Sequence, residues 1–118
     1  MRGAFVAAVG ADWPEKQELE PALMAESAVV VDVLEQCERM GDLHHAIADG
    51  LMTRDDVSAD LAAVVSGRRP GRRRDDEVVV FDSTGTALQD VAAASLVYER
   101  ALARGVGIGV DLGGVVSP

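Results

Sequence analysis

Two short polar segments of the sequence hold residues that can do chemistry. The first is Asp12–Lys16, which places a carboxylate near the only lysine of the chain. An aspartate acts as a general acid or base when it reaches a substrate proton in a partly buried crevice. The second is Asp82–Gly85, where Ser83 and Thr84 supply two hydroxyls just before a predicted helix. Free backbone N–H groups at such a helix start suit an anionic or polar ligand group.

Each segment also has a simpler explanation. An aspartate in a proline-containing turn is commonly a turn former, and Lys16 fits a solvated charge at a helix start. A Ser/Thr pair before a helix is commonly a capping signal. The choice depends on where the neighbouring elements place the two segments.

The composition predicts one small folded unit. The chain has 118 residues, of which 48% are hydrophobic and 26% are charged, a globular balance. Its net charge of -9 argues against a nucleic-acid partner, because surfaces that bind phosphate are basic. The single cysteine, Cys37, allows no internal disulfide and favours a reducing, cytoplasmic location. No stretch approaches the roughly 18 apolar residues of a membrane span, so no membrane partner is expected.

Apolar and β-branched runs predict three buried strands, at residues 4–9, 28–32 and 77–82. Helices are predicted from periodicity and end signals at residues 21–26, 33–39, 42–49, 53–66 and 86–104. Two glycines and a proline make residues 67–76 a predicted loop, and the glycine-rich stretch after Gly105 a predicted tail.

Two of the predicted helices begin with a recognisable signal: Thr53–Asp56 resembles a capping signal, and Thr86–Gln89 has the spacing of a capping box. The second opens the longest periodic stretch of the sequence, which predicts a long amphipathic helix. Its predicted face consists of Leu88, Val91, Ala92, Ser95, Tyr98 and Leu102.

Alternating strands and helices predict an α/β fold. We expect a partial Rossmann-like, doubly wound parallel sheet of about three strands with flanking helices and right-handed crossovers. Reactive groups in such a sheet collect just beyond the carboxyl ends of the strands. The two polar segments follow the first and third strands, so we expect them to share one crevice.

Other features of the sequence predict no site. Adjacent His44 and His45 point about 100° apart on a helix, so no metal site is predicted. Gly105–Gly109 follows a helix and precedes none, which excludes a dinucleotide phosphate loop there. The basic run Arg68–Arg74 is followed at once by acids and fits a solvated loop. Acidic neighbours of Cys37 argue against a nucleophilic thiol.

The two polar segments closely resemble signatures of a known family. Residues 8–19, Ala-Val-Gly-Ala-Asp-Trp-Pro-Glu-Lys-Gln-Glu-Leu, resemble the segment Val-Gly-(Ala/Gly)-Asp-x-Pro-Gly-Lys-x-Glu-Leu of the ornithine cyclodeaminase and mu-crystallin family. Residues 81–90, Phe-Asp-Ser-Thr-Gly-Thr-Ala-Leu-Gln-Asp, look like its second signature. Val29–Asp32 and Gly67–Gly71 stand at fitting places between the two, and the resemblance runs from about residue 3 to about residue 112.

The resemblance implies an enzyme that uses NAD or NADP and acts on α-amino acids or cyclic imines, by oxidoreduction or by a deaminating cyclisation that releases ammonia. Asp12 matches the family's acid/base aspartate near the substrate amine, and Thr84 matches a substrate-side position. The positions that match cofactor contacts are Val9, Gly10, Ala11, Lys16 and Ser83. The choice between NAD and NADP and the identity of the substrate stay open.

Two departures from the family limit this expectation. Glu15 stands where the family usually has glycine, which predicts local backbone strain beside Lys16. The family chain is also much longer, and its dinucleotide fingerprint precedes the stretch matched here. We therefore expect residues 1–112 to be the C-terminal part of a Rossmann-type NAD(P)-binding domain, residues 113–118 to be a tail, and the chain to be inactive alone.

The alternative is a non-catalytic interaction domain, or a subunit of a split protein, that docks on a partner supplying the missing strands. The first strand would normally pair with a strand that precedes it, which leaves an edge and apolar helix faces open. Under either interpretation we expect a homo-oligomer or a partner chain.

Overall fold

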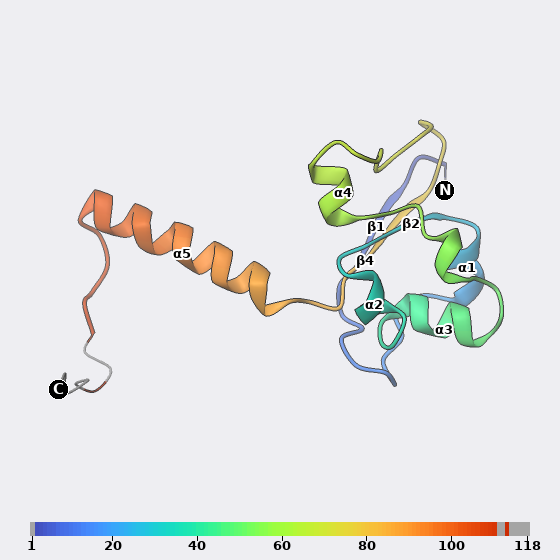
Figure 1. Cartoon of the computed structure of the whole chain (residues 1–118), viewed down its shortest axis with the longest axis horizontal. Coiled ribbons are helices and arrows are strands. Elements are labelled where there is room, and N and C mark those ends of the chain that lie inside the picture. The colour runs from blue at the N-terminus through green and yellow to red at the C-terminus, as the bar shows by residue number, and fades with distance from the viewer. Residues whose placement is uncertain (1, 111–112, 114–118) are drawn as a thin grey trace. The chain divides into compact units, whose positions relative to one another are not determined.

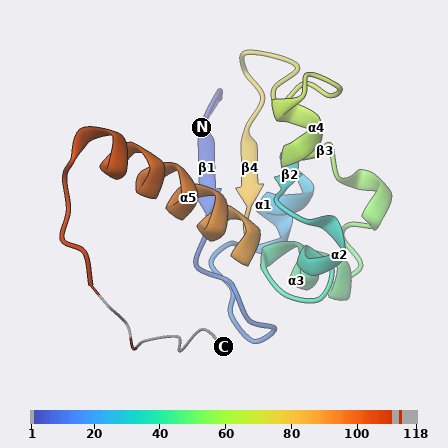
Figure 2. The ribbon, with the colours of Figure 1, turned by 60° about the vertical axis from the view of Figure 1, so that its left-hand side comes forward.

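The sheet is parallel, as predicted, and has four strands. The computed structural model describes residues 2–110 and 113 and divides the chain into two units, Met1–Gly85 and Thr86–Pro118 (Figure 1). Within the first unit the strands lie in the order β1 (Phe5–Ala8), β4 (Val79–Asp82), β2 (Ala28–Val31) and β3 (Ala59–Asp60). Figure 2 shows β1 and β4 side by side with their arrows pointing the same way.

Short helices cover both faces of this sheet. They are α1 (Pro21–Ala25), α2 (Leu34–Cys37), α3 (Asp42–Ala48), the 3-10 turn η1 (Arg54–Asp56) and α4 (Leu61–Val65). Helices α1, α2 and α3 place Met24, Cys37 and Leu43 in a core with Val31 and Val80 of the sheet. Each buried side chain of this size contributes about 1.5–3 kcal/mol relative to an exposed one, so this face supplies much of the stability.

The second face of the sheet is less completely covered. Val64 of α4 packs there against a small cluster that includes Val30 and Val79. Beside this cluster lies an open apolar groove of about 360 Å³, which Phe5 and Phe81 help to line. Phe5 is 64% exposed, although an open parallel sheet is normally covered on both faces.

The sheet has one strand more than the roughly three predicted, and the prediction of a single helix over residues 53–66 is wrong, because η1, β3 and α4 lie there. The predicted capping signal at Thr53 is a capping box, in which the N–H and the hydroxyl of Thr53 donate to Asp56 at 2.7 and 2.8 Å, but the helical turn ends after η1. The N–H of Ser58 then donates to the carbonyl of Val29 at 2.8 Å, and β3 pairs with β2. The free edge of β2 therefore draws this backbone into the sheet, and Asp60 caps α4 through the N–H of Ala63.

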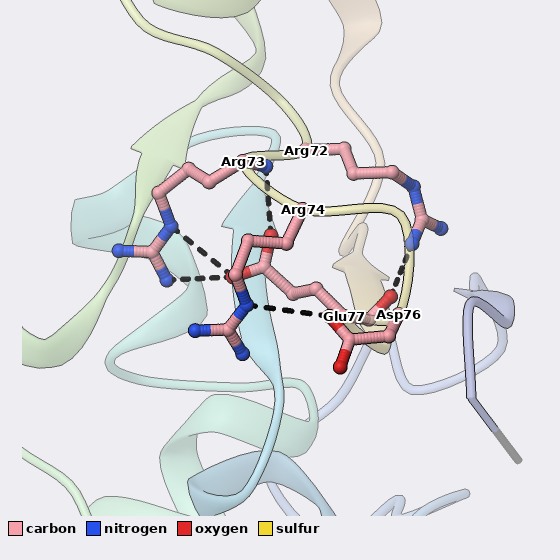
Figure 3. A network of polar contacts seen from close by, with 5 residues as sticks. All are labelled: Arg72, Arg73, Arg74, Asp76 and Glu77. Atoms are coloured by element: carbon pink, nitrogen blue, oxygen red, sulfur yellow. Dashed lines mark hydrogen bonds and ion pairs between the residues drawn. The ribbon is translucent and has the colours of Figure 1, made fainter.

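The arginine-rich loop before β4 is largely exposed, as predicted, and it is also tied to the sheet. Glu77 is buried and accepts hydrogen bonds from the backbone N–H and the guanidinium of Arg73 at 2.8–3.1 Å (Figure 3). These donors, the backbone N–H first, lower the pKa of the Glu77 carboxyl. Arg72 donates to the carbonyls of Glu77 and Ala4, which joins the loop to the chain just before β1.

The second unit holds the 18-residue helix α5 (Ala87–Arg104), which ends as predicted at Gly105 in the left-handed conformation, with φ of 61°. The predicted capping box at its start is wrong, because the N–H of Gln89 donates to the backbone carbonyl of Thr86. No residue of α5 is buried, including its predicted apolar face. The predicted tail at 113–118 lies outside the described residues except for Gly113. Among the helices of residues 2–110, none is long and apolar enough to span a bilayer.

A glycine between α2 and α3 gives a test of this packing. Gly41 has a φ of 88°, and a Cβ there would lie 2.8 Å from Cγ2 of Thr84 and 3.0 Å from Oδ1 of Asp82. Gly50 has a φ of 71° but nothing within 4 Å of its Cβ position. We expect Gly50→Ala to cost about 1 kcal/mol from backbone strain alone and Gly41→Ala about 3 kcal/mol, because it adds a clash. Urea unfolding measures both costs, and equal losses of stability contradict the packing described.

Candidate active site

The two polar segments begin next to each other, at the carboxyl ends of the neighbouring strands β1 and β4. Ala8 pairs with Asp82 in the register of β1 and β4, and the N–H of Ser83 donates to the carbonyl of Ala8 at 2.9 Å. Val9 and Gly10 therefore begin one loop directly beside Ser83, which begins the other. The backbone thus brings the two loops together at the carboxyl ends of neighbouring strands, as expected.

Asp12 and Lys16 form an ion pair on the surface of the first loop. Their side chains are 58% and 56% exposed, and the hydrogen bond from Lys16 lowers the pKa of Asp12. The Asp12 carboxylate is therefore ionised at neutral pH, which suits it to accept a proton. Returning that proton requires a pKa closer to neutrality, and hence a change in its surroundings.

The backbone between β1 and Asp12 has one strongly engaged N–H group. Val9 is exposed, Ala11 is buried, and the N–H of Gly10 donates to the carboxylate of Glu18 at 2.6 Å.

The backbone strain expected at Glu15 is absent. Every residue with positive φ among the described residues is a glycine.

A buried aspartate holds this first loop in place. Asp42, at the start of α3, is 1% exposed and accepts hydrogen bonds at Oδ1 from the N–H groups of Glu18 and Leu19, both at 2.8 Å. Its Oδ2 atom is buried without a partner among the described residues. A ring nitrogen of His45 adds a contact of 2.9 Å to the carbonyl of Lys16. The loop that carries Asp12 is thus anchored by α3.

A second buried aspartate, Asp82, links β4 to the same helix. Its oxygens accept hydrogen bonds from the N–H groups of Asp42 and Leu43 at 3.3 and 2.8 Å. Burial, with a smaller contribution from the charges of Asp42 and Asp32, raises the pKa of Asp82 to about 6, against the opposing effect of the two N–H donors.

A third aspartate, Asp32, follows β2 and holds the second loop. Its Oδ2 accepts hydrogen bonds from the Ser83 hydroxyl at 3.0 Å and from the Gly85 N–H at 2.9 Å. Its Oδ1 accepts a hydrogen bond from the Thr84 hydroxyl at 3.3 Å. Gln36 completes the enclosure, because its side-chain amide donates to the Thr84 hydroxyl and the Gly85 carbonyl at 2.8 and 2.7 Å.

This enclosure corrects, for Ser83 and Gly85, the expectation that the second loop offers free N–H groups to an anion. The N–H of Ser83 is used by β1 and that of Gly85 by Asp32. Thr84 is 5% exposed and its hydroxyl is engaged on both sides, so its assignment to the substrate side stays a prediction.

Sequence reasoning did not assign these holding roles to Asp32, Asp42 or Gln36. Asp32 and Asp82 carry a readable signal, because each is an acid placed directly after an apolar β-branched run. Asp42 and Gln36 lie in helical stretches where a polar residue is expected on the surface, so their spacing gives no comparable signal. Burial also raises the pKa of the neighbouring Cys37 thiol to about 12, consistent with the expectation that it is not a nucleophile.

Comparison with known proteins identifies the family. Residues 1–105 match the model of the ornithine cyclodeaminase/mu-crystallin family. The chain belongs to this family. It is 44% identical over 105 residues to alanine dehydrogenase of Archaeoglobus fulgidus, which covers 89% of this chain and 33% of that protein. It is 46% identical over 107 residues to iminosuccinate reductase of Paracoccus denitrificans, which covers 91% of this chain and 33% of that protein.

Solved structures of family members have the same fold over this region. The Paracoccus denitrificans iminosuccinate reductase, solved with NAD+, superposes with a TM-score of 0.82 at 44% identity, over 95% of this chain and 34% of that one. The Thermococcus litoralis Delta(1)-pyrroline-2-carboxylate reductase, solved with NADH and L-proline, gives 0.83 at 32% identity, over 92% and 34%. This chain therefore spans about a third of the length of its relatives. The Rossmann-like assignment and the family resemblance are confirmed.

The raised pKa of Asp82 predicts a specific pH dependence of stability. In the unfolded chain Asp82 ionises near the ordinary aspartate pKa of 3.8, whereas in the folded chain it holds its proton up to about pH 6. Unfolding between these values releases a proton, so this contribution to stability is present at acidic pH and is lost as the pH rises through 6.

Asp82→Asn removes the titration and serves as the reference, because the other carboxylates titrate in both proteins. We expect the unfolding free energy of the native chain minus that of Asp82→Asn to fall by about 3 kcal/mol between about pH 4 and about pH 7. Chemical denaturation at several pH values measures it. A difference that is constant or grows with pH contradicts the desolvation of Asp82.

Proposed function

We propose that this chain forms the nicotinamide-side part of an NAD(P)-dependent enzyme that oxidises amino acids or reduces imines. The observation that carries the proposal is the hydrogen bond from the N–H of Ser83 to the carbonyl of Ala8, because it joins the two family signatures at one edge of the sheet. In this proposal residues 1–112 are the C-terminal part of a Rossmann-type NAD(P)-binding domain. The family supports this reaction class, as do the names of several relatives, which are dehydrogenases and reductases.

The residues present fit such a cofactor. Lys16 has an exposed ammonium on one loop, and Ser83 has a half-buried hydroxyl on the other. An ammonium donates to hydroxyl or phosphate oxygens, and a hydroxyl pairs with an amide. We assign Lys16 and Ser83 to the cofactor, with the backbone of Val9, Gly10 and Ala11 passing the ring.

Asp12 is the proposed acid/base residue. When bound, NAD(P) accepts or supplies the hydride at the carbon that bears nitrogen. The Asp12 carboxylate takes a proton from the substrate amine as the amine becomes an imine, and returns it in the opposite direction. Lys16 controls this step: contact with the cofactor draws its ammonium away from Asp12, which raises the pKa of Asp12 toward the range that an acid/base needs.

The rest of the site is proposed to lie outside this chain. The chain covers a third of its relatives, and β1 has one open edge among the described strands. We propose that the chain is inactive alone and works as a homo-oligomer or with a further chain segment. The archaeal alanine dehydrogenase was solved as a dimer with bound NAD. A deaminating cyclisation, as in the lysine cyclodeaminase to which the chain is also similar, is the alternative outcome.

A second candidate function is a non-catalytic domain that docks on a partner. The open edge of β1 and the apolar groove beside Phe5 favour it, because both are surfaces that another protein commonly covers. Catalysis by a reconstituted enzyme separates the two candidates.

The test is a chimera in which residues 1–105 replace the matching third of the Paracoccus denitrificans iminosuccinate reductase. We expect NADH-dependent reduction by the chimera and none by the isolated chain. Asp12→Asn in the chimera is expected to lower kcat by about 100-fold or more, since the proton transfer is lost. Asp49→Asn, at an exposed aspartate at the end of α3, is the control and keeps full activity. A folded chimera whose rate is unaffected by Asp12→Asn refutes the proposed role.

A further inference from the structure

The second loop is shaped by one carboxylate. Asp32 is 8% exposed, and it accepts hydrogen bonds from the Ser83 hydroxyl, the Thr84 hydroxyl and the Gly85 N–H. The Asp32 side chain is itself fixed by the residue that follows it, because its Oδ1 also accepts a hydrogen bond from the N–H of Val33 at 2.7 Å. Asp32 therefore contacts each residue of the loop while its own position is fixed at the end of β2.

These contacts set the direction of the loop's hydroxyl groups. A carboxylate that accepts hydrogen bonds has no proton to give, so the protons of the Ser83 and Thr84 hydroxyls point toward Asp32. The Thr84 oxygen also accepts a hydrogen bond from the Gln36 amide, and because Thr84 is buried its hydroxyl is closed to a ligand. Ser83 is half-buried, and its oxygen keeps free lone pairs. It is left as a hydrogen-bond acceptor.

We propose that Asp32 is a positioning residue that fixes the Ser83–Gly85 loop and makes the Ser83 hydroxyl accept hydrogen bonds from the ligand. The ligand group that fits is one with N–H donors, such as a primary carboxamide. A ketone, carboxylate or phosphate oxygen does not fit, because it meets lone pairs and the nearby charge of Asp32. This inference rests on the proposed function, in which the carboxamide of nicotinamide faces Ser83.

The acceptor role of the Ser83 hydroxyl toward the ligand is tested with two dinucleotides that differ at one group. NAD has a carboxamide, whereas its 3-acetylpyridine analogue has a methyl ketone without N–H donors. NMR titration of the nitrogen-15-labelled chain detects weak binding through the amide signals of Ser83 and Gly85. We expect the native chain to bind NAD about threefold to tenfold more tightly than the analogue, the value of one hydrogen bond.

Three variants separate positioning from general stability. Asp32→Asn turns one acceptor into an N–H donor that frees the Ser83 proton, and Ser83→Ala removes the hydroxyl; in both the preference for NAD falls to about one. Asp60→Asn is the matched control, because Asp60 lies at the end of strand β3 and also accepts a backbone N–H, but at α4. It keeps the preference. If Asp32→Asn does not fold, Ser83→Ala still tests the acceptor role, and exchange of the Gly85 amide hydrogen in the native chain tests the positioning role.

Hydrogen exchange in the absence of ligand tests whether Asp32 fixes the Ser83–Gly85 loop. Exchange of the Gly85 amide hydrogen is expected to be slow in the native chain, Ser83→Ala and Asp60→Asn, and about tenfold faster in Asp32→Asn. Rapid Gly85 exchange in the native chain overturns the positioning role. Equal affinity of the native chain for the two dinucleotides overturns the acceptor role of Ser83.

A third result identifies failure of the proposed function itself. Suppose that neither dinucleotide shifts the Ser83 and Gly85 signals while the Gly85 amide hydrogen still exchanges slowly. This result refutes both the assignment of Ser83 to the nicotinamide carboxamide and the acceptor role of its hydroxyl. The hold of Asp32 on the loop is then supported on its own.

Discussion

Three buried aspartates at the carboxyl end of the sheet are the constraint on which the site depends. Asp32, Asp42 and Asp82 are each 8% exposed or less. A carboxylate taken out of water costs several kcal/mol unless donors replace the water, and here backbone N–H groups of loops and of helix α3 do so. Satisfying these charges forces the loops into defined positions. The loop geometry follows from the need to hydrogen-bond buried charge.

The arrangement also has a cost that the fold tolerates. The charges of Asp42 and Asp32 add to desolvation in raising the pKa of Asp82, so three acids close together oppose one another. The unpartnered Oδ2 of Asp42 adds to this cost. A protein selected for stability alone has no reason to keep such a group, whereas a site that must hold two loops beside one another does.

Sequence patterns predicted the parts of the fold that depend on local composition. The runs at residues 28–32 and 77–82 gave strands because β-branched residues favour a sheet, and proline and glycine placed the loops. The two-residue strand β3 escaped prediction because it exists through pairing with β2, not through its own sequence. The segment Asp12–Lys16 was recognisable as a candidate site through the family resemblance. The partners that hold the loops were not, because Asp42 contacts Glu18 across 24 residues of chain, and such contacts leave no local pattern. Helix α5 is a similar case. Its apolar positions indicate that it packs against another surface, but its sequence does not identify that surface.

The most direct test of this account is NMR detection of scalar couplings across hydrogen bonds in the isotope-labelled chain. One coupling joins the amide nitrogen of Ser83 to the carbonyl carbon of Ala8, and a second joins the amide nitrogen of Leu19 to the carboxyl carbon of Asp42. The account predicts both couplings, with slow exchange of both amide hydrogens. Absence of both, with exchange as fast as in an unfolded peptide, contradicts the claim that buried carboxylates and the sheet edge hold the two loops together.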